Sequence, residues 1–203
     1  MRIITVNREF GSGGRELGKR LADALDIAYY DREIITILAE RSSLDKGYIE
    51  RIIEHGSLRG YPITCGQTLS NRSISLGDGP SLLAQQHKVI REIAAKEDCL
   101  IVGRGADYVL QEYRPFKLFV YADMAAKINR CRTKGSAGEN LTDSELKREM
   151  RQIDKARANS HDFMAPCAWN DKHGYHLCIN TTGLEIKNIV PHIAAYAEDW
   201  FKK

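Results

Sequence analysis

Short apolar runs alternate along the chain with longer stretches in which apolar residues recur every three or four positions. The short runs are rich in β-branched and aromatic side chains, which is typical of buried strands. They predict five strands, at residues 3–6, 27–30, 99–102, 117–121 and 175–179. Because helical patterns separate the strands, we expect crossover connections and a mostly parallel sheet covered on both faces, which is an α/β fold.

The longer stretches predict the helices of this fold. After the first strand, Leu17, Leu21 and Leu25 stand four residues apart, so one face of a helix there is apolar. Residues 82–94 and 184–201 carry similar apolar stripes. These helices supply the apolar faces that would cover the sheet.

Two regions depart from the alternation. Residues 34–80 end in a stretch rich in Gly, Ser and Asn, and we interpret them as an insertion packed over the edge of the sheet. In the second region, residues 130–160, Thr142 and Glu145 have the spacing of a capping box and predict a helix that begins around Asp143. We expect residues 1–203 to form one domain that carries both regions.

Composition narrows the possible functions. The chain has 30 Lys and Arg against 27 Asp and Glu, an excess too small to favour nucleic acid as a partner. No apolar run is long enough to span a membrane or to act as a signal peptide, so we expect a soluble, cytoplasmic protein without a membrane partner. The five cysteines lack any C-x-x-C pair and are interpreted as buried thiols. The oligomeric state stays open.

The stretch TVNREFGSGGRELGKRL joins the first strand to the first helix through four glycines. In this layout, backbone N–H groups and the helix N-terminus converge on an anion, usually a phosphate. Glycines are needed because side chains would block the approach and some residues must adopt a positive φ. The stretch therefore favours phosphate binding over a plain structural turn.

The strict phosphate-loop motif G-x-x-x-x-G-K-[ST] is nevertheless absent. In one register Arg8 stands at the first glycine, Gly14 at the lysine and Arg15 at the Ser/Thr position. Shifting by one places Arg15 at the lysine, Glu16 at the magnesium ligand and Glu9 at the first glycine. The dinucleotide pattern G-x-G-x-x-G fails too, because Glu16 replaces its third glycine. Both kinase registers stay open.

Polar residues follow two further strands. Asp31 and Arg32 end the second strand, where open α/β sheets form ligand crevices, although Asp31 could equally cap the next helix and Arg32 be solvated. Arg104 lies between two glycines after the third strand, where a guanidinium can bind a phosphate through two hydrogen bonds. A structural salt bridge is the alternative for Arg104, but the flanking glycines favour close approach by a ligand.

Basic residues cluster in the region 130–160. Arg148, Arg151 and Lys155 recur on one helical face, which usually indicates a solvated surface. For Arg130 and Arg157 we favour a lid whose arginines close over a transferring phosphoryl group.

With these pieces in order, the chain resembles the bacterial cytidylate kinase-like family, a branch of the phosphate-loop nucleoside monophosphate kinases. The segments that carry the resemblance are ITVNREFGSGGRELGKRLA, YYDREII, CLIVGRGADYVL, IDKARAN and YHLCINTTGLEI. The resemblance implies a three-layer α/β/α fold with a five-stranded parallel sheet in the order 2-3-1-4-5. It also implies a helical acceptor-binding insertion, a lid, and ATP with Mg²⁺ as the phosphoryl donor.

The resemblance also assigns roles to residues. A donor-phosphate loop would be formed by Gly11, Ser12, Gly13, Gly14, Arg15 and Glu16. Arg15 would take the place of the missing lysine, and Glu16 would hold magnesium. Thr181 and Thr182 would lie near adenine.

The acceptor side follows the same family pattern with one departure. Arg104 would bind the acceptor's phosphate, and Asp31 and Arg32 would begin the acceptor site. The family's Gly-Arg-Asp segment here reads Gly-Arg-Gly, with Asp107 two residues too late. The lid segment of the family is matched by Asp154, Lys155, Arg157 and Asn159.

The leading hypothesis is an ATP-dependent phosphotransferase that acts on a small phosphate-bearing acceptor, with CMP or dCMP as the default. A kinase of another small acceptor is an alternative on the same fold. A nucleotide-binding protein without transferase activity is the rival from another class, since the degenerate loop could bind without transferring. A Rossmann oxidoreductase comes last.

Overall fold

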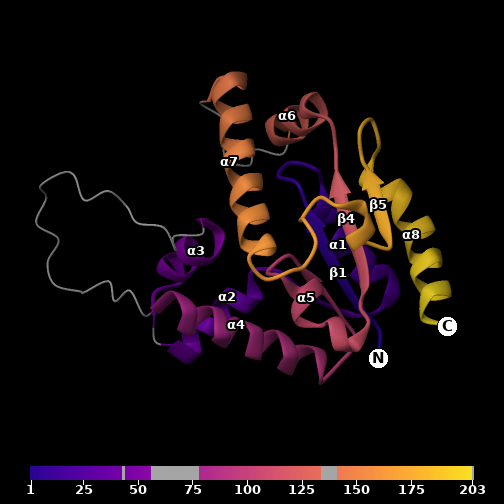
Figure 1. Ribbon diagram of the computed structural model, residues 1–203. Helices are drawn as coiled ribbons and strands as arrows, with labels where there is room; N and C mark the ends of the chain where they lie inside the picture. The colour runs from indigo at the N-terminus through magenta and orange to yellow at the C-terminus, as the bar shows by residue number, and fades with distance from the viewer. Residues whose placement is uncertain (43, 56–77, 134–140, 203) are drawn as a thin grey trace, which may run out of the picture.

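A five-stranded parallel sheet forms the centre of the protein (Figure 1). The computed structural model describes residues 1–42, 44–55, 78–133 and 141–202. The strands are β1 (Ile3–Arg8), β2 (Ala28–Tyr30), β3 (Cys99–Val102), β4 (Phe116–Tyr121) and β5 (Leu177–Asn180). Their order, β2-β3-β1-β4-β5, confirms the predicted α/β fold and its sheet topology.

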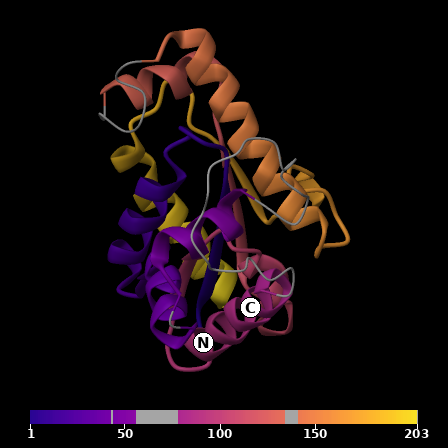
Figure 2. The ribbon, with the colours of Figure 1, turned by 90° about the vertical axis from the view of Figure 1, so that its left-hand side faces the viewer.

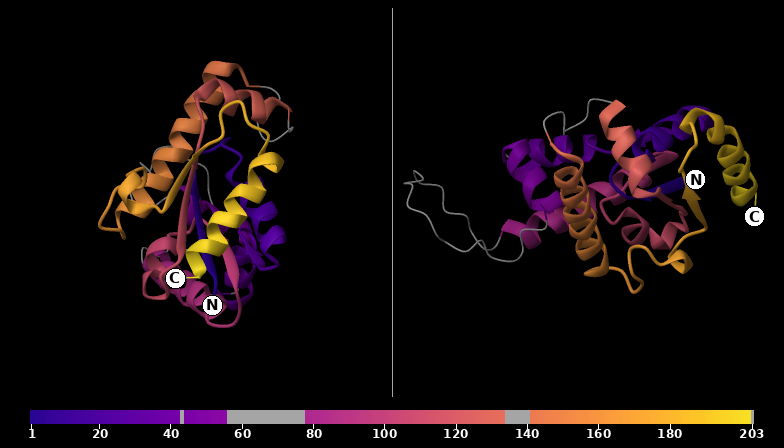
Figure 3. Two further views of the ribbon diagram at one scale, coloured as in Figure 1. Left: turned by 90° about the vertical axis from the view of Figure 1, so that its right-hand side faces the viewer. Right: turned by 90° about the horizontal axis from the view of Figure 1, so that it is seen from above.

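Helices cover both faces of the sheet, which gives the three-layer architecture. One face packs against α1 (Gly14–Leu25) and α8 (Ile186–Phe201). The other packs against α2 (Glu33–Ser42), α4 (Asp78–Ala94) and the short α5 (Ala106–Val109). Figure 3 shows α8, in yellow, along its side of the sheet.

Two further helices stand at the upper end of the sheet. After β4 the chain forms α6 (Met124–Thr133) and then α7 (Asp143–Asp162), which runs beside the sheet from α6 to α3 (Lys46–His55) (Figures 1 and 2). The predicted capping box is present, because the Thr142 hydroxyl accepts from the backbone of Glu145 and the Glu145 side chain accepts from the backbone of Thr142. Two 3₁₀ turns, η1 (Gln111–Tyr113) and η2 (Lys172–Gly174), complete the described chain.

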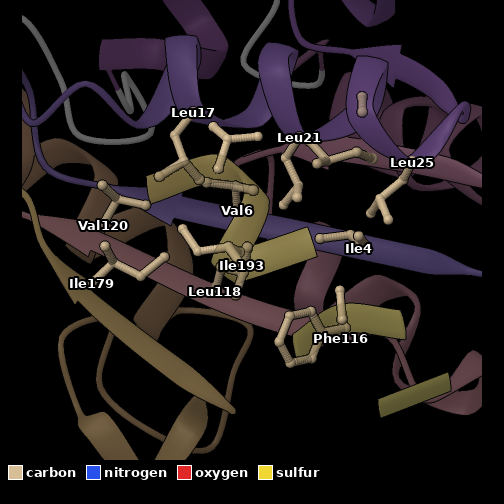
Figure 4. Packing of buried hydrophobic residues seen from close by; sticks show 14 of the residues in the cluster. Ile4, Val6, Leu17, Leu21, Leu25, Phe116, Leu118, Val120, Ile179 and Ile193 are labelled. Atoms are coloured by element: carbon tan, nitrogen blue, oxygen red, sulfur yellow. The ribbon is translucent and has the colours of Figure 1, made fainter. Parts of the chain in front are cut away.

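Aliphatic side chains from both layers form the core (Figure 4). Leu17 and Leu21 of α1 lie against Val6 and Leu118 of the sheet, and all four are fully buried. Burying such a side chain stabilises the fold by about 1.5 to 3 kcal/mol. The four-residue spacing seen in the sequence therefore marks the face of α1 that packs against the sheet. The glycine-rich loop directly precedes this helix.

Some predictions concern residues outside the described ranges. Residues 56–77, which include a large part of the predicted insertion and Cys65, are among them. The division into an insertion at 34–80 and a lid at 130–160 therefore stays a prediction. The four described cysteines are free thiols, and no described helix is long and apolar enough to cross a membrane.

Candidate active site

The glycine-rich loop, residues 9–13, links β1 to α1 in a conformation that favours glycine. Gly11 and Gly13 have φ of 76° and 83°, in the left-handed region. A Cβ at Gly13 would lie 2.8 Å from Cδ1 of Ile186, so a side chain there would require Ile186 to shift. In the described part of the chain, no protein oxygen accepts a hydrogen bond from the backbone N–H of Gly11 or Gly13. These two N–H groups are therefore available to the oxygens of a bound anion such as a phosphate.

Two residues from outside, Arg130 and Thr181, hold this loop, and they are named here the loop anchor. Arg130 Nη1 donates to Gly11 O at 2.9 Å, and its Nη2 donates to Thr181 O at 3.1 Å. The Thr181 hydroxyl donates to Ser12 O at 2.7 Å, and Ser12 and Thr181 are fully buried. These bonds fix the loop to α6 and to the end of β5. The predicted roles of Arg130 at the phosphoryl group and of Thr181 near adenine stay predictions.

A buried lysine joins the same loop to α7. Lys127 Nζ lies 3.0 Å from Glu9 Oε2 and 3.5 Å from Asp154 Oδ2. Asp154 Oδ1 also accepts a hydrogen bond of 2.6 Å from the backbone N–H of Phe10. Burial raises the pKa of Asp154, while these partners and Arg157 favour its charged form. Nothing in the sequence pattern pointed to Lys127, because the contact depends on how α6 and α7 pack.

Arg104 lies on a loop with three successive left-handed residues. Gly103, Arg104 and Gly105 have φ of 71°, 62° and 65°, directly after β3. The Arg104 carbonyl accepts a hydrogen bond of 3.2 Å from Nε2 of the buried Gln86. A Cβ at Gly105 would lie 2.5 Å from Cε of Met164. The two glycines are therefore required by backbone geometry and by close packing at once.

Three further arginines lie close enough to Arg8 to act on its charge: Arg15, Arg104 and Arg157. Together with Arg8 they are named here the guanidinium cluster, and the buried carboxylate of Asp31 pairs with Arg8 and Arg15. Arg15 Nε donates to Asp31 Oδ2, and Arg8 Nη2 lies 3.6 Å from Asp31 Oδ1. Arg157 Nη1 donates to the Arg8 carbonyl at 3.1 Å. Burial, Arg157, Arg104 and Arg15 lower the pKa of Arg8 to about 9, and Asp31 opposes them.

Two carboxylates lie against this cluster: Asp31 pairs with Arg8 and Arg15, and Asp154 Oδ1 lies 3.4 Å from Arg157 Nη1. The cluster lies where the carboxyl ends of β1, β2 and β3 meet, which is where open α/β sheets bind ligands. Guanidinium groups bind phosphate through strong, charge-assisted hydrogen bonds. The arrangement is suited to a phosphate dianion beside the glycine-rich loop.

The structure thus brings four of the predicted site residues together: Arg15, Asp31, Arg104 and Arg157. It places others elsewhere. Arg32 is exposed and lies 3.8 Å from Glu50 of α3, and the Thr182 hydroxyl accepts a hydrogen bond of 2.8 Å from the backbone of Asp123.

Arg8 had appeared in the sequence only as a departure from the phosphate-loop motif. The signal that could have identified it is a charged residue at the end of the first strand, directly before the glycine-rich loop. Its contacts with Asp31 and with the third-strand loop depend on the order of strands in the sheet.

Glu16 is the carboxylate that the sequence predicts as a magnesium ligand. Glu16 lies in the first turn of α1, where its Oε1 accepts a hydrogen bond of 3.0 Å from Arg20. Among the described residues, no group of three or more His, Cys, Asp and Glu side chains could hold a metal ion. Mg²⁺ in phosphate-transfer sites commonly uses one or two carboxylates and takes its other ligands from water and phosphate. Glu16 fits that mode, and its role as a metal ligand stays a prediction.

A buried histidine links α7 to α5 behind Arg104. His161 Nε2 lies 2.9 Å from Asp107 Oδ2, and its Nδ1 lies 3.2 Å from Asp162 Oδ1. Burial lowers the pKa of His161, but the hydrogen bonds and charges of Asp107 and Asp162 outweigh burial and raise it. Asp107, which in the sequence stands two residues too late for the family's aspartate, thus tethers the C-terminal end of α7.

Fold and loop together define the class of the protein: a kinase-type phosphotransferase of the phosphate-loop superfamily. The sequence model of the cytidylate kinase-like family matches residues 3–183, and the chain belongs to that family. The resemblance drawn from the sequence segments is thereby confirmed. A comparison with curated proteins finds no match.

Solved structures share the fold. An uncharacterized protein from Eubacterium ventriosum ATCC 27560 is 22% identical, with a TM-score of 0.68 over 98% of this chain and 99% of that one. Shikimate kinase from Bacteroides thetaiotaomicron is 17% identical, with a TM-score of 0.59 over 97% of this chain and 98% of its own. Shikimate kinase from Acinetobacter baumannii, solved in complex with shikimate, is 14% identical, with a TM-score of 0.53 over 98% and 94%. At these identities the likeness concerns the fold alone.

Proposed function

We propose that this protein transfers the γ-phosphoryl group of ATP to a small phosphate-bearing acceptor, with CMP or dCMP as the first candidates. The observation that carries the proposal is the guanidinium cluster beside the glycine-rich loop, in which Arg8 and Arg15 share the carboxylate of Asp31. Such a concentration of guanidinium groups suits an acceptor that itself carries a phosphate. Membership of the cytidylate kinase-like family supports the same reading.

Catalysis would rest on positioning and electrostatic stabilisation, because phosphoryl transfer needs little covalent chemistry from the protein. The N–H groups of the glycine-rich loop would bind the donor phosphates, and Arg104 would bind the acceptor's phosphate. Arg15 and Arg157 would add charge from α1 and from α7. Magnesium, held through Glu16, would neutralise charge on the donor phosphates.

The first experiment measures ADP release from Mg-ATP by the purified protein with a panel of nucleoside monophosphates. Shikimate, gluconate and dephospho-coenzyme A serve as acceptors from outside the nucleotides. We expect turnover with one nucleoside monophosphate well above the rate with water alone. Turnover only with shikimate or gluconate would replace the proposed acceptor class, since neither carries a phosphate.

A nucleotide-binding protein without transferase activity is the second candidate. It is favoured by one observation, the glycine at position 14 where one register of the motif requires lysine. The same assay decides between the two. If ATP raises the melting temperature but no acceptor on the panel releases ADP, the binding function replaces the kinase.

A further inference from the structure

The Arg8 side chain is buried without the hydrogen bonds that a guanidinium normally makes. Its exposed fraction is 9%, and it has five N–H donors. In the described part of the chain, none of them donates a hydrogen bond, and the ion pair that Arg8 makes is with Asp31 at 3.6 Å. Buried charges are ordinarily paired and hydrogen-bonded, because leaving them unsatisfied is expensive. The Arg8 guanidinium therefore has N–H donors for which the described part of the protein supplies no hydrogen-bond acceptor.

Two glycines make room for this side chain. A Cβ at Gly14 would lie 2.5 Å from the Cβ of Arg8, and a Cβ at Gly103 would lie 2.0 Å from its Nη1. The stem of Arg8 therefore runs beside the start of α1, and its guanidinium lies against the loop that carries Arg104. Gly14 stands at the lysine position of the phosphate-loop motif in the register that puts Arg8 at the first glycine. The Arg8 side chain thus lies next to Gly14, the position at which the motif has its lysine.

Asp31 cannot satisfy Arg8 fully, because it also serves Arg15. The Arg15 guanidinium donates to Oδ2 of Asp31, while Oδ1 of Asp31 is buried without a hydrogen bond. Burial together with Arg157, Arg104 and Arg15 lowers the pKa of Arg8 to about 9, which leaves it protonated at neutral pH. A phosphate entering between Arg8 and Arg104 would supply the oxygens that this group lacks.

We propose that Arg8 binds a substrate phosphate directly and supplies the charge of the lysine that the loop lacks, with Asp31 as its counter-ion in the absence of that phosphate. This rests on the proposed function, whose site it specifies further. The phosphate is either that of the acceptor or a phosphate of ATP. Substrate binding transfers Arg8 from the carboxylate to the phosphate, and no covalent bond changes.

Calorimetric titration of the full chain tests the proposal with four probes: inorganic phosphate, CMP, cytidine and ATP. Arg8→Met is expected to weaken binding of the phosphate compounds by about 10- to 100-fold, in line with the loss of hydrogen bonds to a charged group. Cytidine binding is expected to stay unchanged. A larger loss for CMP than for ATP assigns Arg8 to the acceptor, and the reverse assigns it to the donor. Lys19→Met, which removes an exposed cation of the same helix α1, is the matched control.

Two further variants keep the test valid if Arg8→Met does not fold. Asp31→Asn removes the competing carboxylate, so inorganic phosphate should bind at least as tightly as to the wild type and should raise the melting temperature by more. Gly14→Lys should clash with the Arg8 stem and abolish phosphate binding. The double variant with Arg8→Gly and Gly14→Lys restores the glycine and lysine of the motif and should recover part of that binding.

The outcomes separate this inference from the proposed function. Unchanged phosphate affinity in Arg8→Met and in Arg8→Lys overturns the role of Arg8, even if the wild type is an active kinase. Phosphate affinity that depends on Arg8 without turnover on any acceptor supports the inference and overturns the kinase. A wild type that binds neither inorganic phosphate, CMP nor ATP overturns both.

Discussion

The loop anchor and the guanidinium cluster both lie beside the glycine-rich loop but differ in how their polar groups are satisfied. In the anchor, Arg130 and Thr181 donate to backbone oxygens at 2.7 to 3.1 Å. In the cluster, the Arg8 side chain donates no hydrogen bond within the described part of the chain, and it shares Asp31 with Arg15. Arginine alone therefore does not indicate a binding site. What distinguishes a framework arginine from a ligand-binding one is whether protein oxygens already accept from it.

The largest expected effect on this comparison comes from Arg104→Ala. Loss of a guanidinium that binds the acceptor's phosphate should lower kcat/KM by about 100-fold or more, which corresponds to about 3 kcal/mol of transition-state stabilisation. Stability should change little, since alanine meets the same left-handed backbone strain and the Gln86 bond is to the backbone. Steady-state kinetics and thermal melts measure both. Unchanged kcat/KM would remove Arg104 from the site.

Gly103→Ala should disturb the cluster through packing rather than charge. The added Cβ would lie 2.0 Å from Nη1 of Arg8, at a residue with φ of 71°. We expect the free energy of unfolding to fall by about 2 to 3 kcal/mol, the range for overpacking combined with an unfavourable backbone angle. Urea denaturation measures the loss. A neutral result would mean that the Arg8 guanidinium moves aside at no cost.

Arg130→Met tests the anchor side. It removes hydrogen bonds to Gly11 O and Thr181 O, so the free energy of unfolding should fall by about 1 to 2 kcal/mol. Arg130→Lys is the informative partner variant, because it keeps the charge but cannot hold both oxygens. If kcat drops sharply in Arg130→Met and recovers in Arg130→Lys, Arg130 also acts on the phosphoryl group, as the lid hypothesis predicts.

The smallest expected effect is a pH dependence from His161. Asp107 and Asp162 raise its pKa in the folded state against the opposing effect of burial. Its protonated form therefore stabilises the fold fully below the unfolded pKa of about 6.5, and this contribution is lost as pH rises through the folded pKa. In the wild type, the free energy of unfolding should fall between about pH 6 and 8 as His161 loses its proton. In His161→Gln this fall should be absent. Equal pH profiles for both proteins would contradict the assignment.

Much of the fold followed from the sequence. Alternating apolar runs predicted five strands to within a residue or two, and the helix start at Thr142 followed from its capping box. Arg104 was identified because its glycine neighbours favour close approach by a ligand, a role that stays a prediction. The structure adds that all three residues have left-handed backbone angles. These features depend on residues close together in the chain, where local rules hold.

The sequence by itself determined the sheet, its covering helices and the glycine-rich turn, because periodicity and turn chemistry are local. Only the tertiary structure decided which charges meet. Arg8, Asp31 and Arg157 come from three distant segments, brought together by the strand order and by the packing of α7. In the same structure, the Arg130 side chain donates to the loop carbonyl of Gly11. The buried Arg8 side chain donates no hydrogen bond within the described part of the chain. Burial and partner oxygens are properties of the packed chain, and they separate a residue that holds the loop from one that is ready to hold phosphate.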